Sequence, residues 1–407
     1  MDVEIRPVTA EEFDTWARAV ERAFGTQVRE DELDVHRRTF EPDLSLAAFE
    51  GNDIVATAGA FSLVLTVPGG RLPMPGVTAV GVAPTHRRRG LLTMLMRREL
   101  DDFRDSGNAI AGLWASESSI YGRFGYGLAA YSADLRIERD RAAFARPHQP
   151  WGRMALVERD DALEVFPDVY ERFATGQPGM WMRSKTWWDT ITADLERWRD
   201  GASALFYLLH RSPQGTPDGY VMYRIKHDWN EGVPENVLKV RELVAETPGA
   251  YADLWRYCFD HDLIKHIEAW PRPADEPLLH MVAEPRRLRL KMADGLWLRL
   301  VDVPKALEGR RYSSADQVVL EVRDTFCPWN EGRYELEGGP DGAQCRPTDR
   351  APHLIVDAAD LGATYLGGVR LRTLSRAGRA HEAKPGALAR ADAMFAWDPL
   401  PYCSTVF

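Results

Sequence analysis

The sequence predicts a mixed α/β fold divided into two or three domains. Apolar runs of strand length alternate with segments in which apolar residues recur at helical spacing, and this alternation returns along the chain. The chain has 407 residues, more than a single hydrophobic core usually organises. Apolar residues make up 45% of it, which is typical of a globular protein with large cores.

Residues 1–148 are predicted to form the first domain. Thr9 and Glu12 make a capping box ahead of a helix whose Phe13, Trp16 and Phe24 share one face. Strands are expected at 3–6, 44–49, 54–65, 77–82 and 109–115, with a hairpin turn at 51–53 and an amphipathic helix at 92–103. The predicted order of this domain therefore ends with a strand, a helix and a strand.

The turn between the strand at 77–82 and the following helix carries the most specific signal. It reads Ala83-Pro84-Thr85-His86-Arg87-Arg88-Arg89-Gly90-Leu91-Leu92. Backbone N–H groups at a helix N-terminus converge on one spot, the helix dipole favours an anion there, and glycine permits close approach. Arginine adds forked, charge-assisted donors for phosphate oxygens. Since it lies between a strand and a helix, the turn is predicted to hold a pyrophosphate rather than to be a solvated basic loop.

Two strings in the sequence resemble a known family. The pattern V-x-V-x-P-x-x-R-R-x-G resembles the acetyl-CoA-binding motif of the GNAT superfamily of N-acetyltransferases, although Leu92 stands where that motif has a small residue. The turn as a whole resembles the enhanced intracellular survival (Eis) branch, and so do Ala115-Ser116-Glu117 and Ile120-Tyr121-Gly122-Arg123-Phe124-Gly125-Tyr126-Gly127. Weaker similarities occur at 294–299, 347–349, 365–367 and in the terminal Phe407. The resemblance implies an acetyl-CoA-dependent N-acetyltransferase with tandem GNAT folds and a C-terminal sterol-carrier-like domain.

Residues 149–285 are predicted to form a second α/β unit, which the resemblance makes a degenerate GNAT copy. Strands are expected at 205–210, 220–225 and 237–244, and Thr247-Pro248 caps the next helix. Glu246-Thr247-Pro248-Gly249 stands where the first domain has its arginine turn. Because proline lacks an N–H and glutamate repels phosphate, this turn is a poor pyrophosphate site.

Residues 286–407 are predicted to form the third, sterol-carrier-like unit. Strands are expected at 297–301, 318–322, 334–336 and 353–356, and helices at 361–366 and 387–395. Pro399-Leu400-Pro401 ends the last helix and leaves an extended tail at 402–407. The resemblance implies that this tail reaches the active site.

The predicted cofactor contacts lie in three short segments. The resemblance implies that the strand at 80–82 diverges from its neighbour and that its backbone N–H groups polarise the thioester carbonyl. Ser116 and Glu117 are placed near the sulfur, or are simply a polar strand end. The predicted cofactor residues are Val80, Gly81, Val82, Arg87, Arg88, Arg89, Gly90, Leu91, Leu92, Thr93, Ser116 and Glu117.

Tyr121 is the predicted proton donor to the leaving thiolate. The string Tyr121-x-x-Phe124-Gly125-Tyr126 resembles the superfamily ending in which the first tyrosine lies beside the CoA sulfur. A phenol has a reference pKa of about 10 and suits protonation of a thiolate. Tyr126 is the alternative, and packing is its more expected role.

The resemblance offers the C-terminal carboxylate of Phe407 as the second catalytic group. With a reference pKa of about 3.5 it is a weak base unless burial raises that value. A water relay or electrostatic holding of the amine is equally consistent. The apolar Val406-Phe407 end favours docking of the tail over fraying.

The acceptor is expected to bind between Tyr121, the tail and residues 24–40. The resemblance implies an aminoglycoside acetylated at several amines, in a pocket with acidic and aromatic walls. Candidate acids are Glu30, Asp31, Glu32 and Asp34. Thr26, Gln27 and Val406 occupy positions at which an acidic or aromatic wall residue was expected. The net charge of −10 favours a cationic acceptor and disfavours nucleic acid.

Composition narrows the remaining possibilities. No apolar run approaches the ~20 residues that span a bilayer, and the N-terminus lacks a signal pattern, so a cytoplasmic protein with no membrane partner is expected. The four cysteines and ten histidines show no ligand spacing, so no metal is expected.

A homo-oligomer is expected, and the resemblance implies a hexamer. The alternative functions are a lipid- or acyl-binding protein acting through the third domain, and a protein lysine acetyltransferase.

Overall fold

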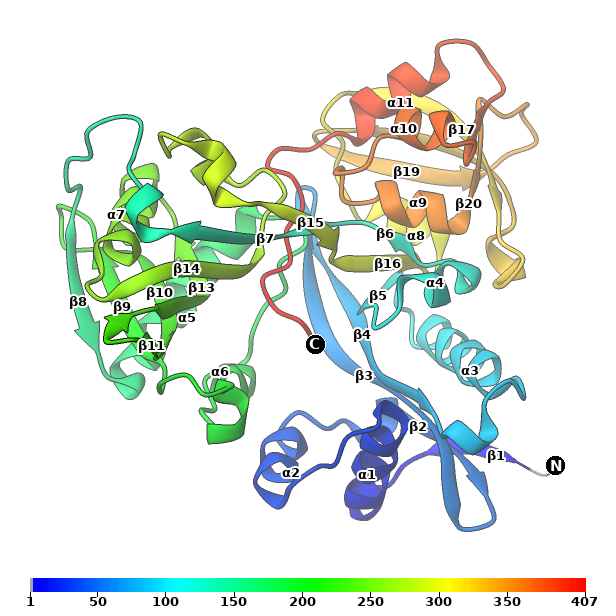
Figure 1. Cartoon of the computed structure of the whole chain (residues 1–407). Coiled ribbons are helices and arrows are strands. Elements are labelled where there is room, and N and C mark those ends of the chain that lie inside the picture. The colour runs from blue at the N-terminus through cyan, green and yellow to red at the C-terminus, as the bar shows by residue number, and fades with distance from the viewer. Residues whose placement is uncertain (1–2) are drawn as a thin grey trace. The chain divides into compact units, whose positions relative to one another are not determined.

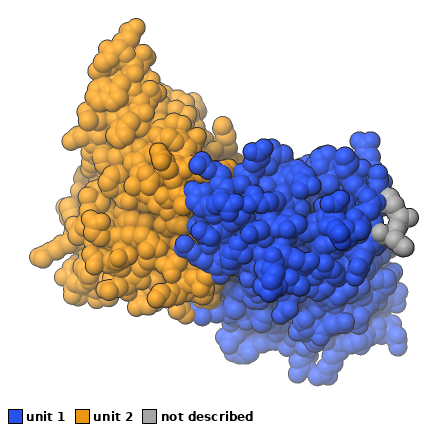
Figure 2. Space-filling view, turned by 90° about the horizontal axis from the view of Figure 1, so that it is seen from below, with its two compact units in different colours: residues 1–130, 294–401, 406–407 blue, residues 131–293, 402–405 orange. Residues whose placement is uncertain are grey.

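The computed structural model describes residues 3–407 and divides into two compact units, coloured separately in Figure 2. Unit 1 holds the chain up to Ala130, Asp294–Pro401 and Val406–Phe407. Unit 2 holds Tyr131–Ala293 and Tyr402–Thr405. The N- and C-terminal parts of the sequence therefore fold together in unit 1, and the central part forms unit 2.

A seven-stranded sheet with the order β1-β2-β3-β4-β5-β16-β6 forms the N-terminal part of unit 1 (Figure 1). β4 and β5 pair in parallel, and the other neighbours are antiparallel. The strands are β1 (Glu4–Pro7), β2 (Ser45–Glu50), β3 (Asp53–Val67), β4 (Gly70–Val82), β5 (Ile110–Trp114), β6 (Gly127–Leu128) and β16 (Leu296–Leu300). The helices of this part are α1 (Phe13–Phe24), α2 (Glu30–Arg37), α3 (Leu91–Asp105) and α4 (Ser118–Tyr121).

Helices α1 and α3 cover opposite faces of this sheet. On β2, Ala47 and Phe49 pack with Phe13 and Trp16 of α1. Leu46 and Ala48, the alternate residues, pack with Leu91 and Leu95 of α3. Since successive side chains of a strand point to opposite faces, the sheet is the middle layer of three. The predicted capping box of Thr9 and Glu12 is present ahead of α1.

The C-terminal part of unit 1 adds a five-stranded sheet with the order β19-β18-β17-β20-β21. Its strands are β17 (Asp316–Arg323), β18 (Gly332–Gly339), β19 (Gly342–Pro347), β20 (Leu354–Asp357) and β21 (Ala380–Glu382). Its helices are α8 (Val303–Glu308), α9 (Ala358–Thr364), α10 (Leu371–Arg376) and α11 (Ala387–Phe395).

Two glycines allow α9 to lie directly on the N-terminal sheet. A Cβ atom on Gly127 of β6 would lie 1.8 Å from the backbone oxygen of Ala359, and one on Gly362 would lie 2.3 Å from that of Leu298. No larger residue fits either position without moving backbone. This contact joins the two parts of unit 1 and explains why glycine follows Tyr126 in the second resembling string.

Unit 2 is a seven-stranded sheet with the order β15-β7-β14-β13-β10-β9-β8. Its strands are β7 (Tyr131–Glu138), β8 (Arg153–Val157), β9 (Phe206–Arg211), β10 (Pro217–Lys226), β13 (Asn236–Ala245), β14 (Ile264–Arg272) and β15 (Lys291–Asp294), with the pair β11 (Trp229–Asn230) and β12 (Val233–Pro234). Its helices are α5 (Arg159–Gly176), α6 (Lys185–Ile191) and α7 (Pro248–Asp260). On β10, Tyr220 packs on the α5 side and Val221 on the α7 side, so this sheet also lies between helices.

Two strands pair outside the domains that the predicted boundaries at residues 148 and 285 assign them to. Residues 131–138 form β7, which pairs with β14 in unit 2 rather than with the first sheet. Residues 296–300 form β16, which pairs with β5 and β6 in the N-terminal sheet. A strand's alternation can be seen locally, but its hydrogen-bonding partner depends on the whole fold.

Candidate active site

A cavity of about 640 Å³ in unit 1 brings the predicted cofactor segments together. We call it the cofactor cavity. Its predicted lining residues are Val80, Gly81, Val82, Arg87, Arg88, Gly90, Leu91, Leu92, Thr93, Ser116, Glu117 and Tyr121, and the others are Ala23, Phe24, His86, Ile120 and Arg123. Of the residues predicted to bind the cofactor, Arg89 does not line the cavity.

The turn before α3 has the backbone form of an anion site. Arg88 and Gly90 are left-handed, with φ of 63° and 84°. Left-handed Gly90 is followed by right-handed helical Leu91, and such a pair turns its N–H groups to one side, where the dipole of α3 adds to them. A Cβ atom on Gly90 would meet no heavy atom within 4 Å, so the space above the turn is open.

The arginines of this turn have different surroundings. Arg87 donates from Nη2 to the backbone oxygen of Ala23 at 3.1 Å and from Nε to that of Val82 at 3.4 Å. It therefore ties the turn to the end of α1 and to β4. Arg88 is exposed and lines the cavity, so its guanidinium is the better placed charge for a phosphate.

The strand β4 diverges from β5 at the cavity. The two strands pair only at Gly76 and Val77, although β4 continues to Val82. Ala83 donates its N–H to the oxygen of Val55 on the β3 side. The N–H and C=O of the preceding residue, Val82, therefore point to the opposite side, where β5 no longer pairs with β4. The expected divergence is present, and it leaves room beside β4 for an extended ligand arm.

Tyr121, at the end of α4, lines the cofactor cavity and is buried. Burial raises its pKa, and a hydrogen bond with Ser116 partly offsets this increase. Tyr126 is fully buried and is not among the lining residues, and its ring centroid lies 6.2 Å from that of Tyr121. The geometry thus favours Tyr121 over Tyr126 as the residue that meets a ligand.

Glu99 is a buried carboxyl group that the sequence reasoning missed. It lies on α3 at 2% exposure, and within residues 3–407 neither of its carboxyl oxygens has a hydrogen-bond partner. Burial raises its pKa well above the ordinary value, and its charge would act on Tyr121 and Tyr126. The available signal was an acid on the apolar face of the helix, four residues after Leu95.

The C-terminal tail is docked, as the sequence predicted. In unit 2, Tyr402 donates its N–H to the oxygen of Pro178 and its hydroxyl to that of Pro271 in β14, both at 2.8 Å. Arg183 donates to Ser404 at 3.2 Å and also to Thr405. In unit 1, the ring of Phe407 lies against Gly76, and Figure 1 shows the C-terminus beside β3 and β4.

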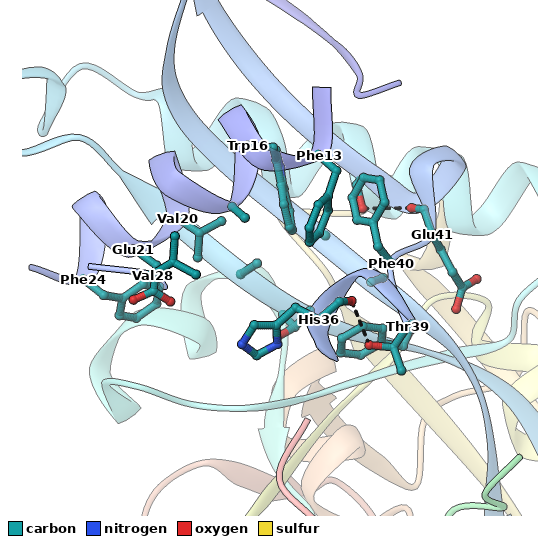
Figure 3. Close-up of a pocket in the computed structure, with 17 residues that line it drawn as sticks. Phe13, Trp16, Val20, Glu21, Phe24, Val28, His36, Thr39, Phe40 and Glu41 are labelled. Carbon is teal, nitrogen blue, oxygen red and sulfur yellow. Dashed lines mark hydrogen bonds between the residues drawn. The ribbon is translucent and has the colours of Figure 1, made fainter. Parts of the chain in front are cut away.

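A second cavity of unit 1, of about 270 Å³, lies between α1, α2 and the strands β3 and β4 (Figure 3). We call it the aromatic cavity. Within the predicted range 24–40, Phe24, Val28, His36, Thr39 and Phe40 line it. The expected acids do not: the lining carboxylates are Glu21 and Glu41, while Glu30 pairs with Arg18 and Glu32 accepts from the backbone N–H of Arg29. Glu32 is turned to the helix start because the capping box of α2 uses its side chain.

The chain matches known families along most of its length. Residues 4–129 and 179–300 each match the acetyltransferase (GNAT) domain family, and residues 303–404 match the sterol carrier protein domain family. An uncharacterized N-acetyltransferase of Streptomyces avermitilis is 42% identical over 398 residues, 97% of each chain. The N-acetyltransferase Eis of Mycobacterium tuberculosis is 38% identical over 360 residues, 86% of this chain and 84% of that relative.

The chain belongs to the Eis family of GNAT N-acetyltransferases.

Solved structures agree with this assignment. Eis1 from Mycobacterium abscessus has a TM-score of 0.85 at 36% identity and covers 99% of this chain and 100% of its own. A GCN5-related N-acetyltransferase from Anabaena variabilis shares the fold, with a TM-score of 0.86 at 20% identity over the whole of both chains. The Eis-family chain is therefore an acyltransferase with two GNAT folds and a C-terminal sterol-carrier-like domain, and the predicted family and fold are confirmed.

In the second GNAT fold of this Eis-family enzyme, a tryptophan side chain occupies the turn that corresponds to the arginine turn of the first. A Cβ atom on Gly249, next to the start of α7, would lie 2.3 Å from Cγ of Trp151. Trp151 and Gly152 in turn donate their N–H groups to Asp253 of α7. The indole thus lies against the start of α7, where an anion would have to approach.

Among residues 3–407, no helix combines the length and apolar character that crossing a membrane requires. No group of three or more histidine, cysteine, aspartate or glutamate side chains in these residues is arranged to hold a metal ion.

Proposed function

We propose that this Eis-family enzyme transfers the acetyl group of acetyl-CoA to the amino group of a small amine bound in unit 1. One observation carries the proposal: the left-handed turn at Arg88 and Gly90, the diverging end of β4 and the hydroxyl-bearing Tyr121 line one cavity. A pyrophosphate, an extended arm and a thioester occur in that order along acetyl-CoA, and the three features provide for each of them.

In the proposed reaction, the amine nitrogen attacks the thioester carbon, a C–N bond forms and the C–S bond breaks. Tyr121 gives its proton to the leaving sulfur and regains one from solvent. A cationic acceptor first gives one proton, directly or through water, to the C-terminal carboxylate of Phe407, which frees the nitrogen lone pair for attack. The nitrogen loses its second proton to solvent as the amide forms. Because burial raises the pKa of Tyr121, its hydroxyl stays protonated at neutral pH and is ready to donate.

The net charge of −10 supports a cationic acceptor. The family resemblance suggests aminoglycosides acetylated at several amines as one such class, and the test includes them. The reaction would be followed as thiol released from acetyl-CoA over aminoglycosides, small amines and lysine peptides, beside calorimetric titration with acetyl-CoA and with a fatty-acyl ligand. Binding of the acyl ligand without binding of acetyl-CoA would contradict the proposal.

A further inference from the structure

The aromatic cavity has walls suited to an apolar ligand. The rings of Phe13, Trp16, Phe24, Phe40 and Phe61 line it. The centroid of Phe40 lies 4.7 Å from that of Phe13 and 5.4 Å from that of Trp16, and Figure 3 shows these three rings together at one end. The cavity leaves space beside these rings, and aromatic walls favour the packing of a further ring.

Several polar groups of these walls are hydrogen-bonded within the protein, and the carboxylate of Glu21, which also lines the cavity, accepts from the hydroxyl of Thr26. Trp16 donates its indole N–H to the oxygen of Leu46 at 3.1 Å. Glu41 accepts from the backbone N–H of Ser62 at 2.7 Å and from its hydroxyl at 2.5 Å, and Figure 3 shows its carboxylate turned away from the rings. Thr39 donates its hydroxyl to the oxygen of His36 at 3.3 Å. A ligand with many hydroxyl groups would lose its hydration here and gain few hydrogen bonds.

The aromatic cavity meets the cofactor cavity at β4. Thr78 and Ala79 line the first, Val80–Val82 line the second, and Phe24 lines both. Ala79 is left-handed, with φ of 53°, and the register of β3 and β4 shifts beside it. A body packed among the rings would therefore present a short side arm at the point where the thioester is proposed to lie.

We propose that the acceptor is a primary amine carried on one aromatic body, such as an arylethylamine, with its ring in the aromatic cavity and its nitrogen at Ala79–Val80. This inference rests on the proposed acetyl transfer and specifies its acceptor. The volume of about 270 Å³ falls just below the usual range of ~300–1,000 Å³ for drug-sized ligands, which suits a body of one or two fused rings.

The first test compares acceptors at saturating acetyl-CoA by thiol release. 2-Phenylethylamine and tryptamine are expected to have kcat/KM at least about tenfold above those of spermidine and kanamycin, because an apolar pocket discriminates by roughly that factor per group. A preference for spermidine or kanamycin would overturn the inference.

A filling variant localises the effect. Val28→Phe, in the loop between α1 and α2, is expected to raise the KM for 2-phenylethylamine about tenfold and to leave the Kd for acetyl-CoA unchanged. Val64→Phe makes the same change at an exposed position of β3 that lines neither cavity, and serves as the control. Equal effects of both variants, or none from Val28→Phe, would place the acceptor elsewhere.

Failure of the inference is distinguishable from failure of the proposed function. If calorimetry shows no binding of acetyl-CoA to the full chain, the proposed acetyl transfer itself is wrong. If acetyl-CoA binds and only spermidine, kanamycin or no amine is acetylated, the cofactor assignment stands and the arylamine acceptor is rejected.

Discussion

The ring of Phe407 lies against the backbone of Gly76, so closely that a Cβ atom there would be 2.9 Å from Phe407 Cε2. Gly76 is paired with Gly112 of β5 at the point after which β4 and β5 separate. The last residue of the chain is therefore docked where β4 and β5 pair before they separate, although neither Phe407 nor Gly76 lines the cofactor cavity.

Gly76→Ala tests whether this docking supports turnover. The added methyl group would displace the ring of Phe407 or the side chain of Leu63, whose Cδ1 would lie 2.6 Å away. If the terminal carboxylate takes part in proton transfer, kcat should fall about tenfold to hundredfold. The KM for acetyl-CoA should change less than about twofold, because Gly76 does not line the cofactor cavity.

The control for this variant is Gly176→Ala, since a Cβ atom there would meet nothing within 4 Å. Steady-state kinetics of both variants at matched acceptor concentrations provide the measurement. An unchanged kcat in Gly76→Ala would remove the docked tail from the mechanism.

Arg88→Gln tests the charge of the turn. Hydrogen bonds to charged groups contribute about 1.5–3 kcal/mol, so the Kd for acetyl-CoA should rise about tenfold to hundredfold. Titration calorimetry at two salt concentrations checks this, and the difference from the parent should shrink at high salt. Arg98→Gln, on the following helix α3 and paired with Asp102, should bind acetyl-CoA normally. Similar losses in both variants would argue against a specific phosphate contact.

Glu99→Gln tests the buried carboxyl group through stability. Its folded pKa is raised, so the unfolded chain loses this proton near its usual pKa of about 4.3 while the folded chain keeps it. Stability therefore falls as pH rises above that value, by up to about 1.4 kcal/mol per pH unit. Glutamine cannot ionise, so urea unfolding should show Glu99→Gln gaining stability relative to the parent between pH 5 and 8. A constant difference over that range would mean that Glu99 is ionised in the folded protein.

Local patterns were sufficient to predict the turn at 87–90, the helix after it and the strand before it. Each depends on residues next to one another: the alternation of the strand, the glycine in the left-handed position and the apolar face of α3. The family resemblance added the pairing of this turn with Tyr121, which the structure places at the same cavity.

Non-local features could not be predicted in this way. The aromatic cavity forms only when α1, α2, β3 and β4 are assembled. The acids near residue 30 were expected there because the family resemblance implies acidic walls for a pocket at residues 24–40. The pairing of β7 and β16 outside their predicted domains likewise depends on partner strands more than 100 residues away in sequence, such as Leu296 opposite Trp114. In the sequence, Glu99 cannot be distinguished from an exposed helical acid, because its burial depends on how α3 packs.

The most direct test of the proposed acetyl transfer is the kcat of Tyr121→Phe under saturating acetyl-CoA and amine. Phenylalanine keeps the ring in its buried place and removes only the hydroxyl, so the fold and the Kd for acetyl-CoA should be preserved. General acid catalysis typically contributes 10²–10⁴-fold, and we predict that kcat falls by at least about a hundredfold. A kcat within about twofold of the parent would contradict the assignment of Tyr121 as the proton donor.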